Sequence, residues 1–252
     1  MEDSTKRFSD RVENYVKYRP HYPKEIIPFL NEHIGLTDEK VIADIGSGTG
    51  ISTELFLENG NKVYGIEPNK EMREAAEKYL EKYKYFISVS GTAEETLLEN
   101  DSMDVVVCGQ AFHWFDVQKA KSEFKRILKE NGYVILLWNS RKIDTSDFLI
   151  AYEKLLLKFG TDYEKVVHKT LESGDDKTIE WFFAPQKSFV HSFKNMQVFD
   201  FEGVKGRLLS SSYAPIDNDE MLEELKNIFN KHNKNGTVEF EYETKVYWGK
   251  MK

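Results

Sequence analysis

The segment VIADIGSGTG at residues 41–50 decides the fold. Residues 41–45 are a short apolar run typical of a buried strand, and residues 49–58 have the composition of a helix. Gly46, Gly48 and Gly50 lie where the two meet. Glycine lets the backbone turn sharply and approach a ligand closely, and the start of a helix offers unpaired backbone amides. The segment therefore predicts a strand, a ligand-binding turn and a helix.

The spacing of these glycines separates two classes of cofactor. A dinucleotide-binding turn has the pattern Gly-x-Gly-x-x-Gly, whereas Ile51 stands at the position of its third glycine here. The acidic residue Asp44 lies just before the first glycine. Its carboxylate would repel a diphosphate and attract the ammonium group of S-adenosylmethionine. The pattern thus predicts S-adenosylmethionine as the cofactor.

Three further segments that follow predicted strands contain candidate ligand-binding residues. Glu67, followed by Pro68, ends the second strand and could accept hydrogen bonds from both hydroxyls of a ribose. Residues 91–94 and 109–115 follow the third and fourth strands. Because ligands of open α/β sheets bind at the carboxyl ends of the strands, we expect all of these segments to line one site.

Strand and helix patterns alternate from residue 41 to residue 138, which predicts a doubly wound, mostly parallel sheet. Strands are expected at residues 41–45, 62–66, 85–89, 103–108 and 133–138, and helices at residues 24–34, 49–58, 117–128 and onward from Asn69.

The pattern changes after about residue 140. Residues 141–190 are rich in aromatic side chains and show no clear strand, so we interpret them as a helical cap insertion. A sixth strand is expected at residues 197–201 and a helix at residues 219–232. Residues 238–248 alternate apolar and charged residues, as a final strand at the sheet edge would.

Composition excludes several functional classes. The chain has 252 residues and a formal net charge of −8, which argues against nucleic-acid binding. Its single cysteine, Cys108, fits a reducing compartment, and no apolar run is long enough to span a membrane. The histidines show no metal-ligand spacing, so no metal is expected. We expect a cytoplasmic monomer or homodimer.

Several motifs together carry a family resemblance over residues 8–248. They are YVKYRPHYP at 15–23, DIGSGTG at 44–50, Glu67-Pro68, AFHWF at 111–115 and SSSYAP at 210–215. The chain resembles the class I S-adenosylmethionine-dependent methyltransferases, in particular the trans-aconitate methyltransferase-like group that acts on small molecules. The resemblance implies a Rossmann-like α/β fold with a seven-stranded sheet, mostly parallel with an antiparallel last strand, and an N-terminal helical lid.

The resemblance also implies roles for individual residues around the cofactor. Asp44, Gly46 and Gly48 would surround its methionine end and Glu67 its ribose. Thr92, Ala93 and Glu94 would lie beside the adenine, and Gln110 and Ala111 under the sulfonium. Many relatives carry Asp where Thr92 stands, so a side-chain contact to the adenine amine is not expected from that position. The predicted cofactor-binding set is completed by Ser47, Gly50, Pro68, Met72 and, from the lid, Tyr15, Tyr18 and Arg19.

The acceptor is expected to be a small molecule, for which a carboxylic acid is one candidate class. Phe112, His113, Trp114 and Arg141 are the predicted substrate-pocket residues. A carboxylate needs no general base, whereas an alcohol or amine would need its proton accepted, and His113 is the candidate base. The alternative for His113 is a packed aromatic neighbour of Trp114. Arg207 is an alternative anion-binding residue, although single arginines are usually solvated.

We expect a single methyltransferase domain over residues 1–252. It would comprise a lid at 1–35, a cofactor-binding core at 36–140, the cap at 141–190 and the C-terminal strands and helix of the core at 191–252. Two other functions stay open: a binding protein that holds S-adenosylmethionine or a metabolite without turnover, and a nicotinamide-dependent oxidoreductase on a similar fold.

Overall fold

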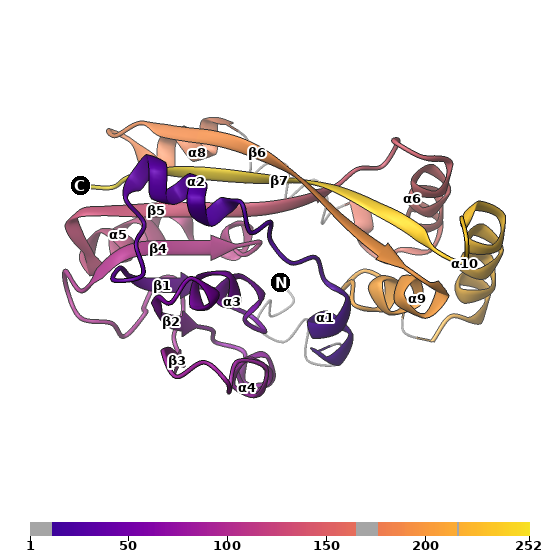
Figure 1. The fold of residues 1–252 in the computed structure, drawn as a ribbon, viewed down its shortest axis with the longest axis horizontal. Coiled ribbons are helices and arrows are strands. Elements are labelled where there is room, and N and C mark those ends of the chain that lie inside the picture. The colour runs from indigo at the N-terminus through magenta and orange to yellow at the C-terminus, as the bar shows by residue number, and fades with distance from the viewer. Residues whose placement is uncertain (1–11, 165–175, 216) are drawn as a thin grey trace.

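A single sheet of seven strands runs through the molecule in the order β3-β2-β1-β4-β5-β7-β6 (Figure 1). The computed structural model describes residues 12–164, 176–215 and 217–252. The strands are β1 (Val41–Ile45), β2 (Lys62–Ile66), β3 (Phe86–Val89), β4 (Met103–Gly109), β5 (Leu128–Arg141), β6 (Ser188–Phe199) and β7 (Val238–Lys250). The strands from β3 to β5 pair in parallel, whereas β7 is antiparallel to both β5 and β6. The structure confirms the predicted Rossmann-like sheet with an antiparallel last strand.

Helices cover both faces of the parallel part of the sheet, as a doubly wound fold requires. The helices described are α1 (Val12–Tyr18), α2 (Ile26–Ile34), α3 (Ile51–Glu58), α4 (Lys70–Tyr79), the short 3-10 helix η2 (Phe112–Trp114), α5 (Val117–Ile127), α6 (Asp147–Phe159), α8 (Asp176–Phe183), α9 (Phe201–Leu209) and α10 (Asp219–His232). Apolar residues of α2 and α3 pack on one face, and those of α5 and α8 pack on the other.

The central strands are apolar throughout because both of their faces are buried. Neighbouring residues of a strand point to opposite faces. On β1, Ile42 packs with the α2 and α3 side, whereas Ala43 and Ile45 pack with the α5 and α8 side. All three side chains are fully buried. This two-sided burial is what the continuous apolar runs predicted.

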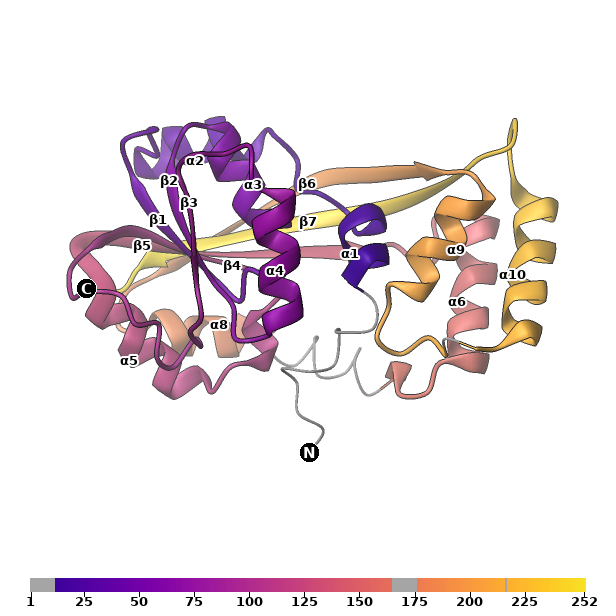
Figure 2. The same cartoon turned by 90° about the horizontal axis from the view of Figure 1, so that it is seen from below.

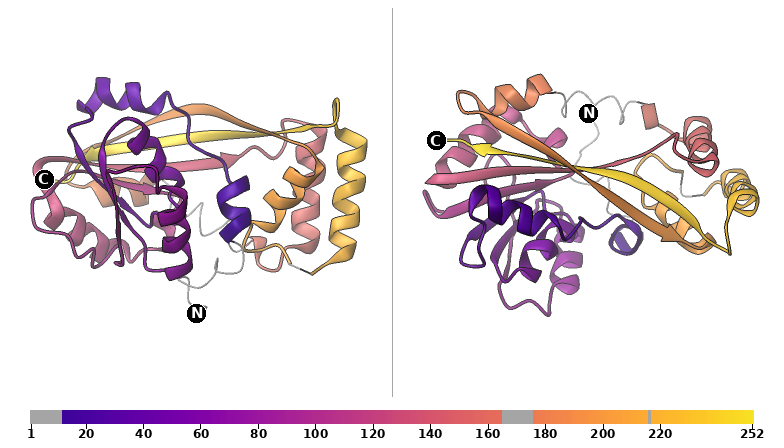
Figure 3. Two further views of the ribbon diagram at one scale, coloured as in Figure 1. Left: turned by 60° about the horizontal axis from the view of Figure 1, so that its bottom comes forward. Right: turned by 45° about the horizontal axis from the view of Figure 1, so that its top comes forward.

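The molecule is elongated, with the α/β core at one end and a helical unit at the other (Figures 1 and 2). The long strands β5, β6 and β7 extend out of the core and connect the two ends (Figure 3). At the far end, side chains of α6, α9 and α10 share one apolar cluster with the first residues of β7. Helix α1 packs against α4 of the core and α9 of the far unit, so it lies between the two ends.

Two sequence predictions for the C-terminal part are wrong. The sixth strand covers Ser188–Phe199, not residues 197–201, and Phe201 already begins α9, where the Asp200 side chain accepts a hydrogen bond from the Gly203 amide. The last strand does not lie at the edge, because β6 occupies that position beside β7. An edge strand is solvated on its open side, and alternate β6 residues are exposed, so its sequence lacks the apolar run of a central strand.

The helices that follow β6 lie beside α6. Helix α10 contacts α6 directly, and α9, which also contacts α1 and β6, shares one apolar cluster with both. We define the cap by its packed elements: α6, α9, α10 and the segment at residues 210–215. Sequence order could not reveal this grouping, because the cap is closed by segments on both sides of β6.

Candidate functional site

The glycine turn after β1 has the backbone geometry that its sequence predicts. Gly46, Gly48 and Gly50 have φ values of 68°, 56° and 90°, in the left-handed region where side chains are disfavoured. A Cβ atom on Gly46 would lie 2.5 Å from the Cβ of Ala111, which leaves no room for a side chain. Helix α3 begins directly after the turn, at Ile51. The turn is therefore held in place by the segment that follows β4.

Asp44 is fully buried beneath this turn and is only half satisfied. Its Oδ2 accepts hydrogen bonds from the hydroxyls of Ser52 at 2.7 Å and Thr53 at 2.6 Å. Its Oδ1 is also buried and has no hydrogen-bond partner among the described residues. Burial raises the pKa of Asp44 to about 6, although the two hydroxyls oppose the shift. A buried carboxylate oxygen without a donor is a ready acceptor for a cationic ligand group.

Glu67 is a second buried carboxylate on the other side of the turn. Its Oε2 accepts the Gly48 amide at 3.0 Å, and its Oε1 accepts the Asn69 amide at 2.8 Å. Burial raises the pKa of Glu67, which the two amides partly offset. Each of its oxygens keeps a further lone pair for a hydroxyl donor. The carboxylate thus joins the carboxyl end of β2 to the glycine turn.

The remaining residues of the predicted cofactor-binding set around the turn lie close to it. The Ser47 amide donates to the Ile66 carbonyl at 3.1 Å. Met72 places its Cε 3.4 Å from where a Gly48 Cβ would stand. Pro68 is half-buried, and its carbonyl accepts a hydrogen bond from Arg73 at 3.0 Å. The structure therefore brings the ends of β1 and β2 and the start of α4 together.

The segment after β3 forms a compact turn. The Thr92 hydroxyl accepts the amides of Glu94 at 3.2 Å and Glu95 at 3.1 Å, and Ala93 is buried. Glu94 reaches across to accept the Asp116 amide at 2.8 Å, next to the start of α5. The side chains of Thr92 and Glu94 thus hold the segment in shape, while Ala93 is buried between them.

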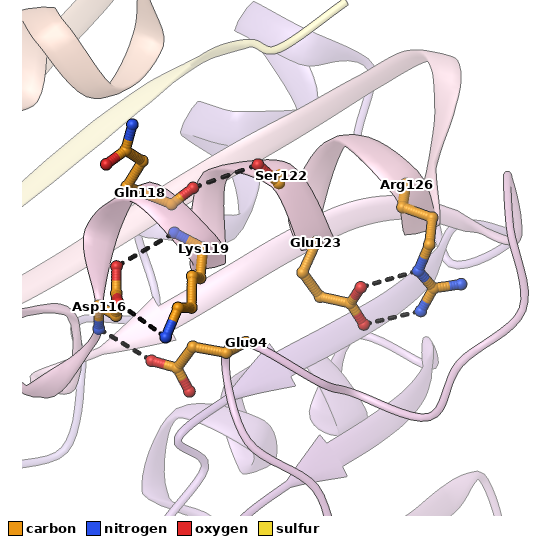
Figure 4. Close-up of a pocket in the computed structure, with 7 residues that line it drawn as sticks. All are labelled: Glu94, Asp116, Gln118, Lys119, Ser122, Glu123 and Arg126. Carbon is orange, nitrogen blue, oxygen red and sulfur yellow. Dashed lines mark hydrogen bonds and ion pairs between the residues drawn. The ribbon is translucent and has the colours of Figure 1, made fainter.

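A surface pocket borders this segment, but its polar groups satisfy one another (Figure 4). Glu94, Asp116, Gln118, Lys119, Ser122, Glu123 and Arg126 line it. Asp116 caps α5 through the Lys119 amide, and both carboxylate oxygens of Glu123 accept from Arg126 at 2.7 Å. Lys119 pairs with Asp116 and Arg126 with Glu123, while Glu94 accepts the Asp116 amide. The pocket does not include Asp44 or Glu67.

Gln110, at the carboxyl end of β4, is held in a strained backbone conformation. Its φ of 56° is uncommon for a residue other than glycine. The conformation is fixed from both sides, because its amide donates to the Leu137 carbonyl at 2.9 Å and its Nε2 donates to the Asn139 carbonyl at 3.0 Å. Strain of this kind clusters at ligand-binding sites. The predicted residues Gln110 and Ala111 therefore lie beside the glycine turn on a fixed backbone.

The aromatic residues after Ala111 differ in burial: one lies in the core and two lie nearer the surface. Phe112 is fully buried, and its ring packs edge-on against Trp138 and Phe182, so this residue belongs to the core. His113 and Trp114 are half-buried, with ring centroids 4.7 Å apart. The predicted pocket wall is thus restricted to His113 and Trp114, because Phe112 points into the sheet packing.

The lid residues do not all face the glycine turn. The Tyr18 ring lies against Gly206 of α9, where an added Cβ would clash at 2.0 Å, and edge-on to Phe199. The Arg19 guanidinium stacks over the Tyr15 ring at 4.8 Å and donates to the Ser210 carbonyl at 2.8 Å. The lid therefore contacts the cap as much as the core.

Arg141 is the predicted pocket residue that the structure places elsewhere. Its guanidinium forms an ion pair with Glu153 of α6 and donates to the Tyr163 hydroxyl at 3.1 Å. It also lies over the Tyr152 ring at 5.1 Å. Its charge is compensated within the cap, so it is not available as an unpaired cation for an acceptor.

Sequence reasoning missed two contributors to the site. Tyr22 is buried with its hydroxyl 2.8 Å from where a Gly109 Cβ would stand, and burial raises the pKa of its phenol, with Asp44 adding to the effect. Asn139 connects the lid to β5 through its side-chain amide, which donates to the Pro20 carbonyl at 3.3 Å. Tyr22 could have been found from the sequence, because it lies within the YVKYRPHYP motif. Arg207, a candidate anion-binding residue in the sequence, is buried rather than solvated.

Among the described residues, no cluster of histidine, cysteine, aspartate and glutamate could hold a metal ion. Within the same ranges, no helix has the length and apolar character needed to cross a membrane.

Comparison with known proteins adds a family match to this geometry. Residues 43–136 match a family model described as a methyltransferase domain. An uncharacterized methyltransferase of Schizosaccharomyces pombe is 31% identical over 135 residues, which is 53% of each chain. The chain thus spans about half the length of the curated relatives it matches.

Solved structures share the fold over a longer part of the chain. A candidate type II methyltransferase from Anaeromyxobacter dehalogenans has a TM-score of 0.70 at 16% identity, covering 93% of this chain and 98% of that one. Phosphoethanolamine N-methyltransferase 2 from Haemonchus contortus has a TM-score of 0.57 at 16% identity, covering 98% of this chain and 58% of that one. The chain therefore shares the fold of these structures, and its residues 43–136 resemble a methyltransferase domain.

Proposed function

We propose that the chain is an S-adenosylmethionine-dependent methyltransferase that transfers a methyl group to a small-molecule acceptor by in-line displacement. The observation that carries the proposal is the buried, half-satisfied carboxylate of Asp44 beneath three left-handed glycines. It lies within the segment that matches the methyltransferase family model. A cationic group is the ligand that this carboxylate favours, and a diphosphate is one that it repels.

The residues present fit S-adenosylmethionine. Asp44 would pair with its ammonium group, Gly46 and Gly48 would let the methionine part approach the backbone, and Glu67 would accept from the ribose hydroxyls. Further proposed contacts are Ser47, Gly50, Pro68, Met72, Thr92, Ala93, Glu94, Gln110 and Ala111. From the lid, Tyr15, Tyr18 and Arg19 are proposed to contact the cofactor or the acceptor. The Haemonchus contortus protein of similar fold, described in complex with S-adenosyl-L-methionine, supports this choice.

The chain's own part in the reaction is alignment and exclusion of water. S-adenosylmethionine supplies an activated methyl group when it is bound. The protein must therefore orient the acceptor atom in line with that group and keep water out. The lid contributes by covering the carboxyl ends of β4 and β5, where Asn139 donates to the lid carbonyls of Pro20 and His21 at 3.3 and 3.4 Å.

The class of acceptor decides whether a base is needed. A carboxylic acid, as in the trans-aconitate methyltransferase-like group, is already ionised and would need none. For an alcohol or amine, half-buried His113 is the proposed base, with Trp114 as pocket wall. A pH profile of turnover that loses its alkaline plateau in His113→Gln would support the base role, whereas an unchanged profile would reject it.

The first experiment is thermal unfolding with S-adenosylhomocysteine and, in parallel, with NAD. Ligand at about 100 times its dissociation constant stabilises a protein by about 2.7 kcal/mol, which for this size raises Tm by about 5–10 °C. We expect that rise with S-adenosylhomocysteine only, and its loss in Glu67→Gln. The matched control is Glu58→Gln, an exposed carboxylate at the end of α3 that pairs with Lys24.

The alternatives give different outcomes. A shift with NAD alone would favour a nicotinamide-dependent oxidoreductase and refute the proposal. A shift with S-adenosylhomocysteine, but no release of it from S-adenosylmethionine with any acceptor, would favour a protein that only binds the cofactor. We also propose one functional unit over residues 1–252, in which the lid, core and cap together enclose the acceptor. The cytoplasmic location and the monomeric or dimeric state stay predictions.

A further inference from the structure

Two arginines and several tyrosines cluster where the lid meets the cap, Arg207 buried and Arg19 partly buried. Arg207 of α9 is only 6% exposed, and it donates to the Tyr242 hydroxyl at 3.2 Å and to the Ser211 hydroxyl at 3.1 Å. Arg19 of the lid donates to the Ser210 carbonyl at 2.8 Å, and its Nε is buried without a hydrogen-bond partner in the described part of the chain. Two guanidinium groups from different elements thus meet at the 210–215 segment.

Within the described ranges, no acidic side chain compensates the charge of these two arginines. No carboxylate among the described residues forms an ion pair with either guanidinium. Their neighbours are phenols, of which Tyr213 and Tyr242 interact with both. Burial and the nearby Arg207 charge lower the pKa of Arg19. Buried charges in proteins are normally paired, because an uncompensated buried charge is strongly unfavourable.

Arg141 is a nearby arginine whose charge is paired within the protein. It is the last residue of β5, borders the cap, interacts with Tyr152 and Tyr213, and forms an ion pair with Glu153. Arg207 interacts with the same two tyrosines but has no carboxylate partner in the described part of the chain. Arg141 has a carboxylate partner within the protein, whereas none is described for Arg207 nearby. This difference indicates that the anion for Arg207 comes from a ligand.

The cluster is connected to the proposed site of methyl transfer. Arg19 is followed directly by Pro20 and His21, whose carbonyls accept from the Asn139 side chain. The Asn139 carbonyl in turn accepts from Gln110, the strained residue at the end of β4. A short hydrogen-bonded path therefore links Arg19 to the carboxyl ends of β4 and β5.

We propose that Arg19 and Arg207 form an anion-binding subsite that holds an oxyanion of the methyl acceptor. The subsite takes a carboxylate or phosphate group through charge-assisted hydrogen bonds, with the tyrosine hydroxyls as additional donors. It fixes the end of the acceptor that does not react, and so orients the reacting atom. That the bound anion belongs to the methyl acceptor rests on the proposed methyltransferase function, whereas the existence of an anion-binding subsite rests only on the two arginine charges.

The test is thermal unfolding of the full chain with succinate, with inorganic phosphate and with uncharged succinamide. Each is measured at constant ionic strength, with and without S-adenosylhomocysteine. The variants are Arg207→Gln, Arg207→Lys and Arg19→Gln, and the matched control is Arg126→Gln, whose arginine pairs with Glu123 on α5. Circular dichroism verifies that each variant is folded, and Arg207→Lys keeps the charge if the glutamine variant does not fold.

We expect succinate or phosphate to raise the Tm of the wild type and of Arg126→Gln, with no effect of succinamide. The affinity for the anion should fall about 30-fold or more in Arg207→Gln and Arg19→Gln, as for a buried charge pair that loses one partner. A larger effect of succinate identifies a carboxylate, and a larger effect of phosphate identifies a phosphate group.

Two results would overturn the proposal. One is an equal anion effect in all variants, which reports general exclusion of the salt from protein surfaces. The other is no anion effect in the wild type. Because the measurement without S-adenosylhomocysteine does not depend on cofactor binding, failure of the subsite and failure of the methyltransferase proposal are distinguishable.

Discussion

The α/β core and the junction of lid and cap each bury two like charges, but of opposite sign. In the core, Asp44 and Glu67 flank the glycine turn, and Asp44 keeps one oxygen without a donor. At the junction, Arg19 and Arg207 lie together without a carboxylate partner among the described residues. Elsewhere in the cap, Arg141 is compensated by Glu153. Paired charges such as that of Arg141 stabilise the fold, whereas the unpaired charges are the ones that we propose to bind ligands.

The largest expected effect is on the compensated pair. Arg141→Met leaves the Glu153 carboxylate in the cap without its cation, and breaking a buried ion pair costs about 3–5 kcal/mol. Because both side chains retain some exposure, at 9% and 19%, we expect the lower end, about 3 kcal/mol, in urea unfolding. Arg207→Met should cost clearly less, since it removes an uncompensated charge. If both variants lose equal stability, the contrast between the two arginines is wrong.

The second effect separates stability from binding at Asp44. Asp44→Asn removes a buried charge whose pKa is raised from 3.8 to about 6, so the ligand-free protein should gain about 2–3 kcal/mol at pH 7.5. The same change should lower the affinity for S-adenosylhomocysteine about 100-fold or more, because the ligand's ammonium group loses its carboxylate partner. Calorimetry measures this affinity.

Asp104→Asn is the matched control for Asp44→Asn. Lys129 and the Val41 amide outweigh partial burial and lower the pKa of Asp104, so this variant should be less stable than the wild type and should bind normally. A ligand-free Asp44→Asn protein that is less stable than the wild type would contradict the assignment of Asp44 as a ligand-binding charge.

The third effect tests the close packing of the glycine turn. Gly46→Ala must place a Cβ 2.5 Å from that of Ala111 at a φ of +68°, so we expect a loss of about 2 kcal/mol and weaker cofactor binding. Gly35→Ala is the control, because its φ is +66° and nothing lies within 4 Å of the added Cβ. That variant should lose only about 1 kcal/mol in unfolding. Equal losses would mean that contact with Ala111 is unimportant.

The fourth effect is the pH dependence that follows from Asp44. A raised pKa in the folded state means that the protonated group stabilises the folded protein below about pH 4, and that this contribution is lost as the pH rises through about 6. The stability gain of Asp44→Asn should therefore vanish as the pH falls from about 6 to about 4. S-adenosylhomocysteine affinity should fall about tenfold per pH unit below pH 6, since the ionised form binds. A pH-independent affinity in calorimetry would exclude this role.

The smallest expected effect is at an exposed pair. Lys70→Met removes the partner of Glu74 on the surface of α4, where the two side chains are 72% and 61% exposed. Pairs of this kind contribute about 1 kcal/mol or less, and raised salt should reduce the difference from the wild type. A loss as large as that of Arg141→Met would show that burial does not set the ranking.

The strands and the site loops of the core were predictable from sequence because their signals are local. Apolar runs at β1, β4 and β5 reflect two-sided burial, and glycine spacing reflects left-handed backbone in one turn. The strand at β6 was misplaced because one edge of it is solvated, so its pairing with β7 leaves no clear pattern. Helix α9 was missed for a related reason, since its helical signal follows that strand without a break.

By itself, the sequence determined the sheet of the core, the turn at residues 44–50 and the acid at its neighbour strand, because each depends on residues that are close in the chain. Only the tertiary structure decided which charges are compensated. In the sequence, Arg141 and Arg207 were both candidates to bind an anionic substrate, yet the first forms an ion pair with Glu153 and the second is buried beside Arg19. Arg19 and Ser210 are joined by a hydrogen bond although 191 positions separate them. Compensation of charge depends on burial and on partners brought together by packing, and no local pattern encodes either.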